Sequence, residues 1–527
     1  MRGPAPGMMR EALGLLLALL PGLLLALGCE GDGDGGNGLV IRSQPLAPNC
    51  ATAAAGSFPS GLTLLSEQLA QAALVQVSPP GIATYDVDAE RPIRLAFQNI
   101  GTDSDSDGRD DATAIAPIVG FPLPPFMGSI QAPSDEIALV STSNYEQVLA
   151  FDPATARPVE VTIDVPPAIP AERYPLLPPP GSAAPRTGLS TLACVQPPIP
   201  EDSDGNPIGI EPACDPVIPS FLTTLSEGKA VAGDRLFVAT SNLLRGSVFR
   251  PGTVLVFDWL EAAGTLTLKP AVDVPMLFTT GFNPTGVEAF ETPGGRELVL
   301  VTVTGAIGSG SGASNVLSEA AVDVIDPSVP RIVATIPLGF AGPSFDAPAI
   351  EPAGRLAWLG ASSQRQLYAV DLRLLDDPRL YAESGPPVVL DGLSLGFGDA
   401  RIFTADHPLV LPARADRRAS SSCEGFTHVT TNFAGTEVYA TDFCDGTLTR
   451  VRQDLAGNAP IPYPADRFQI AWQSSPFAPN DAIGELRAPS LVAARHGIPG
   501  IDFTTPDVLT LVGLPEAQLC SLRVESP

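Results

Sequence analysis

A cluster of aspartates in the first quarter of the chain has the residue types and spacing of a calcium site. Residues 101 to 114 are GTDSDSDGRDDATA, with five aspartates within nine positions. Counted from the first, carboxylates stand at positions 1, 3, 5 and 9, and a glycine stands at position 6. Calcium needs several converging oxygens, and the glycine permits the sharp bend that brings them together. The expected ligands are Asp103, Asp105, Asp107, the backbone carbonyl of Arg109, and Asp111.

The loop is not an EF-hand, because Ala114 occupies position 12 and no helical pattern flanks it. The spacing resembles the DxDxDGxxD hairpin loops of integrin-type propellers, in which calcium stiffens a turn between strands. A solvated acidic linker is the alternative. We expect a structural calcium ion, because this many clustered like charges repel one another without a cation.

Other residues that could do chemistry are few and scattered. The three histidines, His407, His428 and His496, lack metal-ligand spacing to one another or to a cysteine. The GSGSGAS stretch at 308 to 314 lacks the order of a nucleophile elbow. A net charge of -28 argues against a nucleic-acid partner, since the phosphate backbone would be repelled. The sequence therefore identifies no catalytic residue.

The first residues have the pattern of an export signal. Arg2 and Arg10 precede the apolar run LGLLLALLPGLLLALG, which is too short for a comfortable membrane span and ends at Cys29. The small residues before Cys29 resemble a bacterial lipobox, which implies lipidation of its thiol; an ordinary secretory signal is the alternative. We expect a signal peptide over 1–28 and a lipidated cysteine with a Gly/Asp-rich tether over 29–47. The resemblance implies a cell-envelope protein of the outer membrane, facing the periplasm or the cell surface.

Six cysteines follow Cys29, an even number that suits disulfides in an exported protein. Fifteen pairings can be drawn, and free buried thiols are the alternative. Sequence proximity favours two pairs and leaves the two outermost cysteines for a third. The expected pairs are Cys194–Cys214, Cys423–Cys444 and Cys50–Cys520.

The elements that must position these residues are short strands in a repeated phrase. A strand with alternating apolar residues ends in Asp, and a turn and another strand follow, as in EQVLAFDPATARPVEVTI (146 to 163) and AAVDVIDPSVPRIVATI (320 to 336). One such unit cannot cover its own apolar face, so successive units must pack together. The repeated aspartates are Asp86, Asp152, Asp258, Asp326 and Asp371.

Residues 320 to 373 resemble the YVTN-type repeat of lactonase-like and surface-layer β-propellers, and weaker copies extend over about residues 60 to 455. The resemblance implies an all-β fold: a β-propeller of seven blades, each a four-stranded antiparallel sheet, with six or eight as alternatives. It also implies that the repeated aspartates are structural and bond turn backbone groups. We expect one propeller domain over 48–527 with a Pro-rich insertion at about 175–220, and a Cys50–Cys520 bond would fasten the ring.

These features favour a non-enzymatic, lipid-anchored binding or scaffold module for a protein, glycan or other partner outside the cytoplasm. Contact with the membrane is expected through the N-terminal lipid alone. The Pro-rich insertion is the expected recognition element, because long loops on a rigid scaffold usually carry function. The alternative is a lactonase-like hydrolase at the channel mouth, with His428 as a candidate, although the family's catalytic residues match no positions here.

Overall fold

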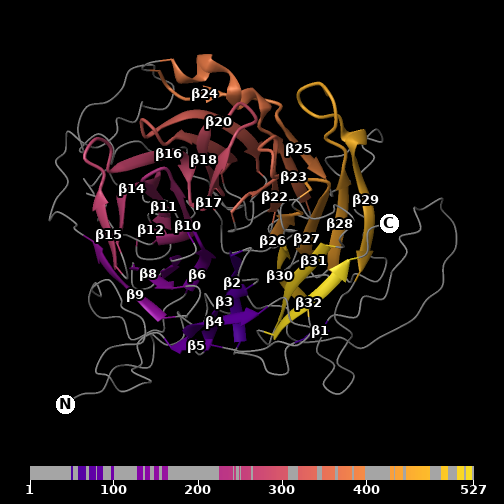
Figure 1. Ribbon diagram of the computed structural model, residues 1–527. Helices are drawn as coiled ribbons and strands as arrows, with labels where there is room; N and C mark the ends of the chain where they lie inside the picture. The colour runs from indigo at the N-terminus through magenta and orange to yellow at the C-terminus, as the bar shows by residue number, and fades with distance from the viewer. Residues whose placement is uncertain are drawn as a thin grey trace, which may run out of the picture.

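The computed structural model describes an all-β ring (Figure 1). The described residues lie between 49 and 524, in stretches separated by gaps. They are 49–50, 57–66, 71–78, 80–86, 96–99, 127–134, 137–142, 147–152, 157–163, 225–240, 243–244, 248–249, 251–262, 265–306, 318–340, 347–361, 366–382, 385–397, 428–432, 434–442, 447–474, 488–495, 507–514 and 518–524.

For description we divide most of the described strands into seven groups of four antiparallel strands, numbered as units in chain order; units 2 and 3 are joined in one nine-stranded sheet, and unit 4 has a fifth strand. Unit 1 contains β2 (Ser57–Ser66), β3 (Gln71–Ser78), β4 (Pro80–Asp86) and β5 (Ala96–Asn99). Unit 2 contains β6 (Met127–Gln131), β7 (Ala138–Thr142), β8 (Gln147–Asp152) and β9 (Arg157–Ile163). Unit 3 contains β10 (Leu225–Ala232), β11 (Arg235–Thr240), β14 (Pro251–Ala262) and β15 (Thr265–Pro270).

The remaining units follow the same order. Unit 4 contains β17 (Pro284–Glu291), β18 (Glu297–Val303), β19 (Ala320–Asp326) and β20 (Arg331–Gly339). Unit 5 contains β21 (Ala349–Ile350), β22 (Leu356–Ala361), β23 (Gln366–Asp371) and β25 (Ser394–Phe397). Unit 6 contains β26 (His428–Thr431), β27 (Glu437–Asp442), β28 (Thr447–Gln453) and β29 (Phe468–Ser474). Unit 7 contains β30 (Ala488–Arg495), β31 (Asp507–Leu514), β32 (Gln518–Val524) and β1 (Asn49–Cys50).

Four further strands and three short helices complete the described elements. They are β12 (Leu243–Leu244), β13 (Val248–Phe249), β16 (Met276–Phe282), β24 (Val388–Val389), and the 3-10 helices η3 (Arg373–Asp376), η4 (Pro378–Tyr381) and η5 (Ala465–Arg467). None of the described helices has the length and apolar character needed to cross a membrane.

The architecture confirms the predicted all-β propeller fold. The blade count of seven stays a prediction, since several connections between the units lie outside the described residues. Ring closure is visible in the register of unit 7. β1, from the start of the described chain, pairs antiparallel with β32 from its end, with Asn49 opposite Ser521 and Cys50 opposite Cys520. The two ends of the fold therefore share one sheet, as the sequence predicted.

The core differs in one respect from the sequence-based expectation that each strand buries a single face. All six residues of β22, LAWLGA, are buried. On β18, Leu298 and Leu300 belong to the apolar cluster shared with unit 5, whereas Val299 and Val301 belong to the cluster shared with unit 3. Each middle sheet is covered by a neighbour on both sides, so both faces of its strands are apolar.

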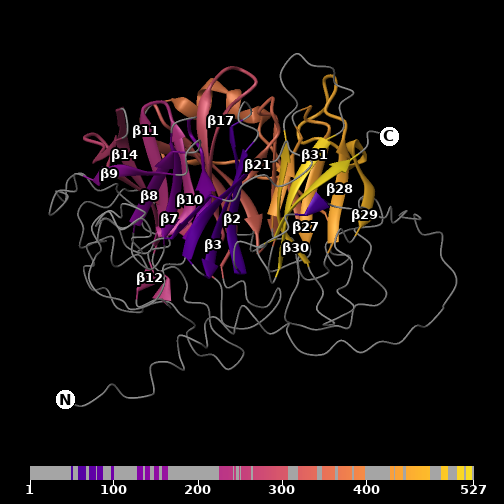
Figure 2. The same cartoon turned by 60° about the horizontal axis from the view of Figure 1, so that its bottom comes forward.

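Strand direction divides the ring into two faces. Within a unit the four strands alternate in direction, so the fourth strand ends on the face where the next unit's first strand begins. We call this the connection face. The turns between first and second strands and between third and fourth strands lie on the other side, the turn face. In the tilted view the strands run between these two faces (Figure 2).

Candidate functional site

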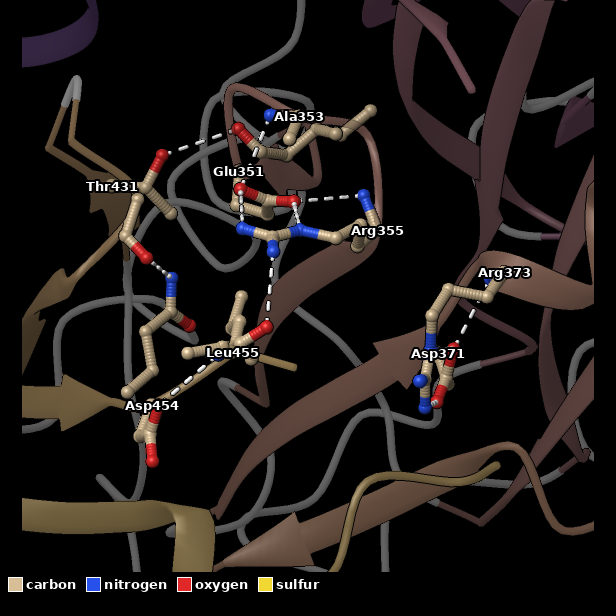
Figure 3. A network of polar contacts seen from close by, with 12 residues as sticks. Glu351, Ala353, Arg355, Asp371, Arg373, Thr431, Asp454 and Leu455 are labelled. Atoms are coloured by element: carbon tan, nitrogen blue, oxygen red, sulfur yellow. Dashed lines mark hydrogen bonds and ion pairs between the residues drawn. The ribbon is translucent and has the colours of Figure 1, made fainter. Parts of the chain in front are cut away.

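A cluster of charged residues, drawn in Figure 3, joins turns of units 5 and 6 that lie on the turn face. Glu351, directly after β21, is buried, and its carboxylate accepts hydrogen bonds from the backbone N–H groups of Ala353 (3.1 Å) and Arg355 (2.9 Å). The Arg355 Nε donates to the same carboxylate at 2.7 Å, and its Nη1 donates to the backbone carbonyl of Leu455 in unit 6 at 3.0 Å. Arg355 therefore joins two units through one guanidinium.

A glycine lets this turn approach the neighbouring unit on its other side. Gly354 has a φ of +65°, and a Cβ there would lie 1.9 Å from the backbone oxygen of Glu291 at the end of β17. No other residue fits this contact without moving backbone. The turn that carries Glu351 and Arg355 is thus fixed against unit 4 as well as unit 6.

A second acid–arginine pair lies beside the first. Asp371, at the end of β23, accepts from the Arg373 backbone N–H (3.1 Å) and Nε (3.0 Å), and from the Tyr463 backbone N–H (3.1 Å). Arg373 donates to the carbonyls of Ala459 (2.8 Å) and Pro460 (2.6 Å), and its guanidinium carbon lies 3.6 Å from the centre of the Tyr463 ring. We call Glu351, Arg355, Asp371 and Arg373, with the loop 455–463 that they hold, the arginine junction.

The charged groups of the arginine junction favour a structural role over a catalytic one. The hydrogen bond that Arg355 donates to the Glu351 carboxylate raises the pKa of Arg355 above its ordinary value. Burial lowers the pKa of Arg373, but the hydrogen bond and charge of Asp371 outweigh it, so the net shift is upward. Both arginines therefore stay charged and cannot exchange protons near neutral pH. What the cluster can do is hold two units in fixed orientation.

Further polar bridges stiffen unit 6 from within and bind it to unit 5. Arg450 and Glu437 form a buried bidentate pair with contacts of 2.9 and 2.8 Å. The Trp358 indole N–H of unit 5 donates to the Gln453 side chain at 2.8 Å, and the Trp358 and Phe468 rings pack edge to face at 5.4 Å. Such buried networks are satisfied only in one arrangement, so they specify how the units pack.

The repeated aspartates have the predicted structural role where their side chains are described, with one variation. Asp326 accepts from the Ser328 backbone N–H (3.0 Å) and hydroxyl (2.6 Å), and Asp371 bonds the turn backbone as given above. Asp258 instead lies 3.8 Å from Arg235 in an ion pair across the β11–β14 hairpin. Asp86 and Asp152 are the last residues of β4 and β8, where the phrase predicted strand ends.

Most of the predicted ligand and cysteine positions lie outside the described residues. These are the calcium loop at Asp103, Asp105, Asp107, Arg109 and Asp111, the lipidation site Cys29, the cysteines Cys194, Cys214, Cys423 and Cys444, and the histidines His407 and His496. The calcium site, the lipid anchor and all three disulfides therefore stay predictions. Within the described stretches no group of His, Cys, Asp or Glu side chains is arranged to hold a metal ion.

His428 is described, and its position bears on the hydrolase alternative. It lies on β26 opposite Thr441 of β27. Two acidic residues lie on that strand: Asp442 directly follows Thr441, and Glu437 is four residues before Thr441, which corresponds to about 13 Å of strand. Glu437 also forms an ion pair with Arg450. The register thus leaves Asp442, and not Glu437, as the acidic residue of β27 nearest to this histidine.

One candidate residue for proton chemistry, Glu288, was not identified from the sequence. Glu288 lies on β17, a strand on the inner side of the ring (Figure 1), and its side chain is half-buried. It stands opposite Leu300, so it shares the face of the sheet that packs toward unit 5. Burial raises the pKa of Glu288 to about 8. A carboxylate among the apolar residues of PTGVEAFE is the sequence signal that could have identified it.

Burial also raises the pKa of Asp323. Both oxygens of its carboxyl group accept hydrogen bonds. It accepts from the Thr280 backbone N–H (2.8 Å) and hydroxyl (2.6 Å) and from the Thr335 hydroxyl (2.8 Å). These bonds fasten β16 to unit 4, which is a structural task. Glu288 is therefore the described carboxyl best placed for proton chemistry near neutral pH.

Comparison with known proteins gives a likeness of fold alone. No protein-family model and no curated protein sequence matches the chain. Among solved structures, the β-propeller domain of Cps50 (Swd1) from Myceliophteria thermophila is 10% identical, with a TM-score of 0.42 over 90% of this chain and 98% of that chain. Hydrazine synthase from Kuenenia stuttgartiensis is 13% identical, with a TM-score of 0.39 over 76% and 84%. The description of the propeller therefore rests on this chain's own sheets.

Proposed function

We propose that this protein is a lipid-anchored β-propeller of the bacterial cell envelope that binds or organises a protein or glycan partner. The observation that carries the proposal is the distribution of chain between the described strands. β5 ends at Asn99 and β6 begins at Met127, β9 ends at Ile163 and β10 begins at Leu225, and β25 ends at Phe397 and β26 begins at His428. By strand direction, all three long connections start and finish on the connection face.

The rigidity of the ring supports the same function. The charged groups of the arginine junction connect unit 5 to unit 6, and the Glu437–Arg450 pair stiffens unit 6 from within. A scaffold with fixed geometry, in which long connections start and finish on one face, is the usual arrangement of a recognition surface. The connection that contains the Pro-rich insertion, residues 164–224, is the longest of the three.

A deletion within this insertion tests the recognition role. Removing residues 180–212 should abolish chemical cross-links between the protein and its envelope partner, while thermal unfolding stays that of the wild type. The matched control is Asp377→Ala with Arg379→Ala, which removes an exposed ion pair from the turn face. The same cross-linked partners, identified by mass spectrometry in the deletion variant and in the wild type, would reject the insertion as the recognition element.

The calcium loop is part of the proposal as a structural site between the first two units. Its chemistry supports a hard cation held by Asp103, Asp105, Asp107, Asp111 and the carbonyl of Arg109. Calorimetric titration of calcium into metal-free protein should show one site that disappears in Asp105→Ala. Substitution of Asp202, in the shorter acidic stretch PEDSDGNP, should leave the titration unchanged. Heat equal to that of dilution in the wild type would end the calcium proposal.

Glu288 favours a second candidate function, the lactonase-like hydrolase. A carboxyl with a pKa of about 8 can donate or accept a proton near neutral pH. The test is a panel of small lactones with purified protein. If this candidate is correct, turnover follows an apparent pKa near 8 and disappears in Glu288→Gln, whereas Glu291→Gln on the exposed end of the same strand keeps it. Absence of turnover across the panel favours the binding module.

A further inference from the structure

The ring closure is unusually small for the sheet it completes. In unit 7 the strands β30, β31 and β32 have eight, eight and seven residues, but β1 has two. The register contains two residue pairs, Asn49 with Ser521 and Cys50 with Cys520. Two backbone pairs offset little of the conformational entropy that is lost when the chain segment before unit 1 is fixed against the sheet. A closure of this size needs another source of stability.

The register of β1 and β32 suggests a disulfide as this further source of stability. Residues directly opposite in an antiparallel pair have Cα atoms about 4.5 to 5.5 Å apart, which lies within the range that a disulfide spans. The same pair of strands therefore places one cysteine from each end of the fold at bonding separation. A disulfide between them would enclose residues 50 to 520 in one covalent loop, and long loops gain most from such a bond in the chain-entropy description.

We infer that Cys50 and Cys520 form a redox latch, so that the oxidation state of this pair sets whether β1 stays on the ring. In the closing step, the two thiols lose two protons and two electrons and one S–S bond forms. The oxidant is a disulfide-bearing molecule, which is reduced to two thiols. Reduction reverses the step and leaves, among the described contacts of β1 with β32, the two backbone pairs. This inference goes beyond the proposed binding function and does not depend on a partner.

A cut within the ring gives a direct readout of the latch. A site-specific protease sequence inserted between residues 187 and 188 would divide the full chain into two fragments. Cys50 lies in the first fragment, and the other five cysteines of the expected pairs lie in the second. After oxidation with oxidised glutathione and cleavage, the fragments should migrate together on a denaturing gel without reductant and separate when reductant is added.

Variants assign the bond and test its consequence. Cys520→Ser should separate the fragments without reductant, whereas Cys423→Ser with Cys444→Ser should keep them joined. Reduction of an otherwise identical protein that retains only Cys50 and Cys520 should lower Tm by about 5 °C and increase amide hydrogen exchange of residues 518–524 at least tenfold. Fragments that separate without reductant in the oxidised wild type, or that stay joined in Cys520→Ser, would overturn the assignment. Unchanged exchange on reduction would overturn the latch.

Discussion

At the scale of single residues, buried ion pairs connect unit 5 to unit 6. Asp371 and Glu351 are both buried, and each is neutralised by an arginine that also reaches backbone carbonyls of unit 6. Buried ion pairs add little compared with apolar packing, but removal of one partner leaves an uncompensated charge. Their effect is therefore on the specificity of unit packing more than on net stability.

Loss of Arg373 should be costly for this reason. Arg373→Ala leaves the Asp371 carboxylate buried without its guanidinium, and we expect the free energy of unfolding to fall by about 3 kcal/mol. The control is Arg379→Ala, since Arg379 is 88% exposed and pairs with Asp377 on the surface. That variant should have the same unfolding midpoint in urea as the wild type. Urea unfolding followed by tryptophan fluorescence measures both, and equal midpoints for the two variants would contradict the role of the arginine junction.

Glu288 predicts a specific dependence of stability on pH. Its folded pKa of about 8 lies above the ordinary value of 4.5, so between these pH values the folded protein holds a proton that the unfolded chain releases. Stability from this group is fully present below about pH 4.5 and is lost as pH rises toward 8. Glu288→Gln removes the titration and should gain on the order of 4 kcal/mol relative to the wild type between pH 4.5 and pH 8.5.

Urea unfolding at a series of pH values from 4.5 to 8.5 measures this difference. The matched control is Glu291→Gln, which changes an exposed carboxylate at the end of the same strand. Its unfolding should follow the wild type at every pH. Parallel curves for Glu288→Gln and the wild type would show that the carboxyl titrates normally.

At the scale of elements, the outer strands show how a ring of sheets avoids edge-to-edge association. β9 and β15 pair in parallel, so units 2 and 3 cover each other's edges. β24 covers β20 of unit 4. The outer strand of unit 6, β29, has seven uncharged residues, FQIAWQS, and contains a bulge at Ala471, because Arg450 pairs with Trp472 and Val451 pairs with Ile470. Bulges of this kind twist an edge strand away from other strands.

Deletion of Ala471 should therefore promote self-association. Without the extra residue β29 pairs regularly with β28 and presents a straight, uncharged edge. We expect dimers or larger species in sedimentation velocity at concentrations where the wild type has one species of lower mass. A second change, Gln469→Lys on the exposed face of the strand, should restore the wild-type distribution. A deletion variant that sediments like the wild type would assign the protection of this edge to something other than the bulge.

At this scale, features that depend on neighbouring residues could be predicted from the sequence, whereas contacts between residues far apart in the chain could not. The phrase at 320 to 336 predicted the β19–β20 hairpin, and the resemblance to the propeller repeat implied that Asp326 bonds the turn backbone; both features depend on neighbouring residues. The arginine junction was not predicted, because Arg355 and Leu455 are 100 residues apart and no periodicity connects them. The parallel β9–β15 pairing was missed for the same reason. Glu288 was missed because its environment depends on how units 4 and 5 pack.

At the scale of the whole molecule, the fold is a ring whose two ends meet in one sheet. The recurring strand phrases indicated units that must pack in succession, and the closing sheet contains strands from both ends of the described chain. The covalent loop of the latch would enclose nearly all of the fold. On the chain-entropy description a disulfide around a loop this long is worth about 5 kcal/mol or more.

Cysteine trapping tests the ring most directly, because it measures whether the two ends are neighbours in solution. In a Cys50→Ser, Cys520→Ser background, Asn49→Cys with Ser521→Cys should form a disulfide under mild oxidation, since these residues are direct partners. Asn49→Cys with Thr510→Cys is the control, because Thr510 is paired with Ser521 one strand further away, at about 10 Å. Efficient bonding of the first pair alone is the predicted result. Failure of the first pair, or equal bonding of both, would contradict a closed ring in this register.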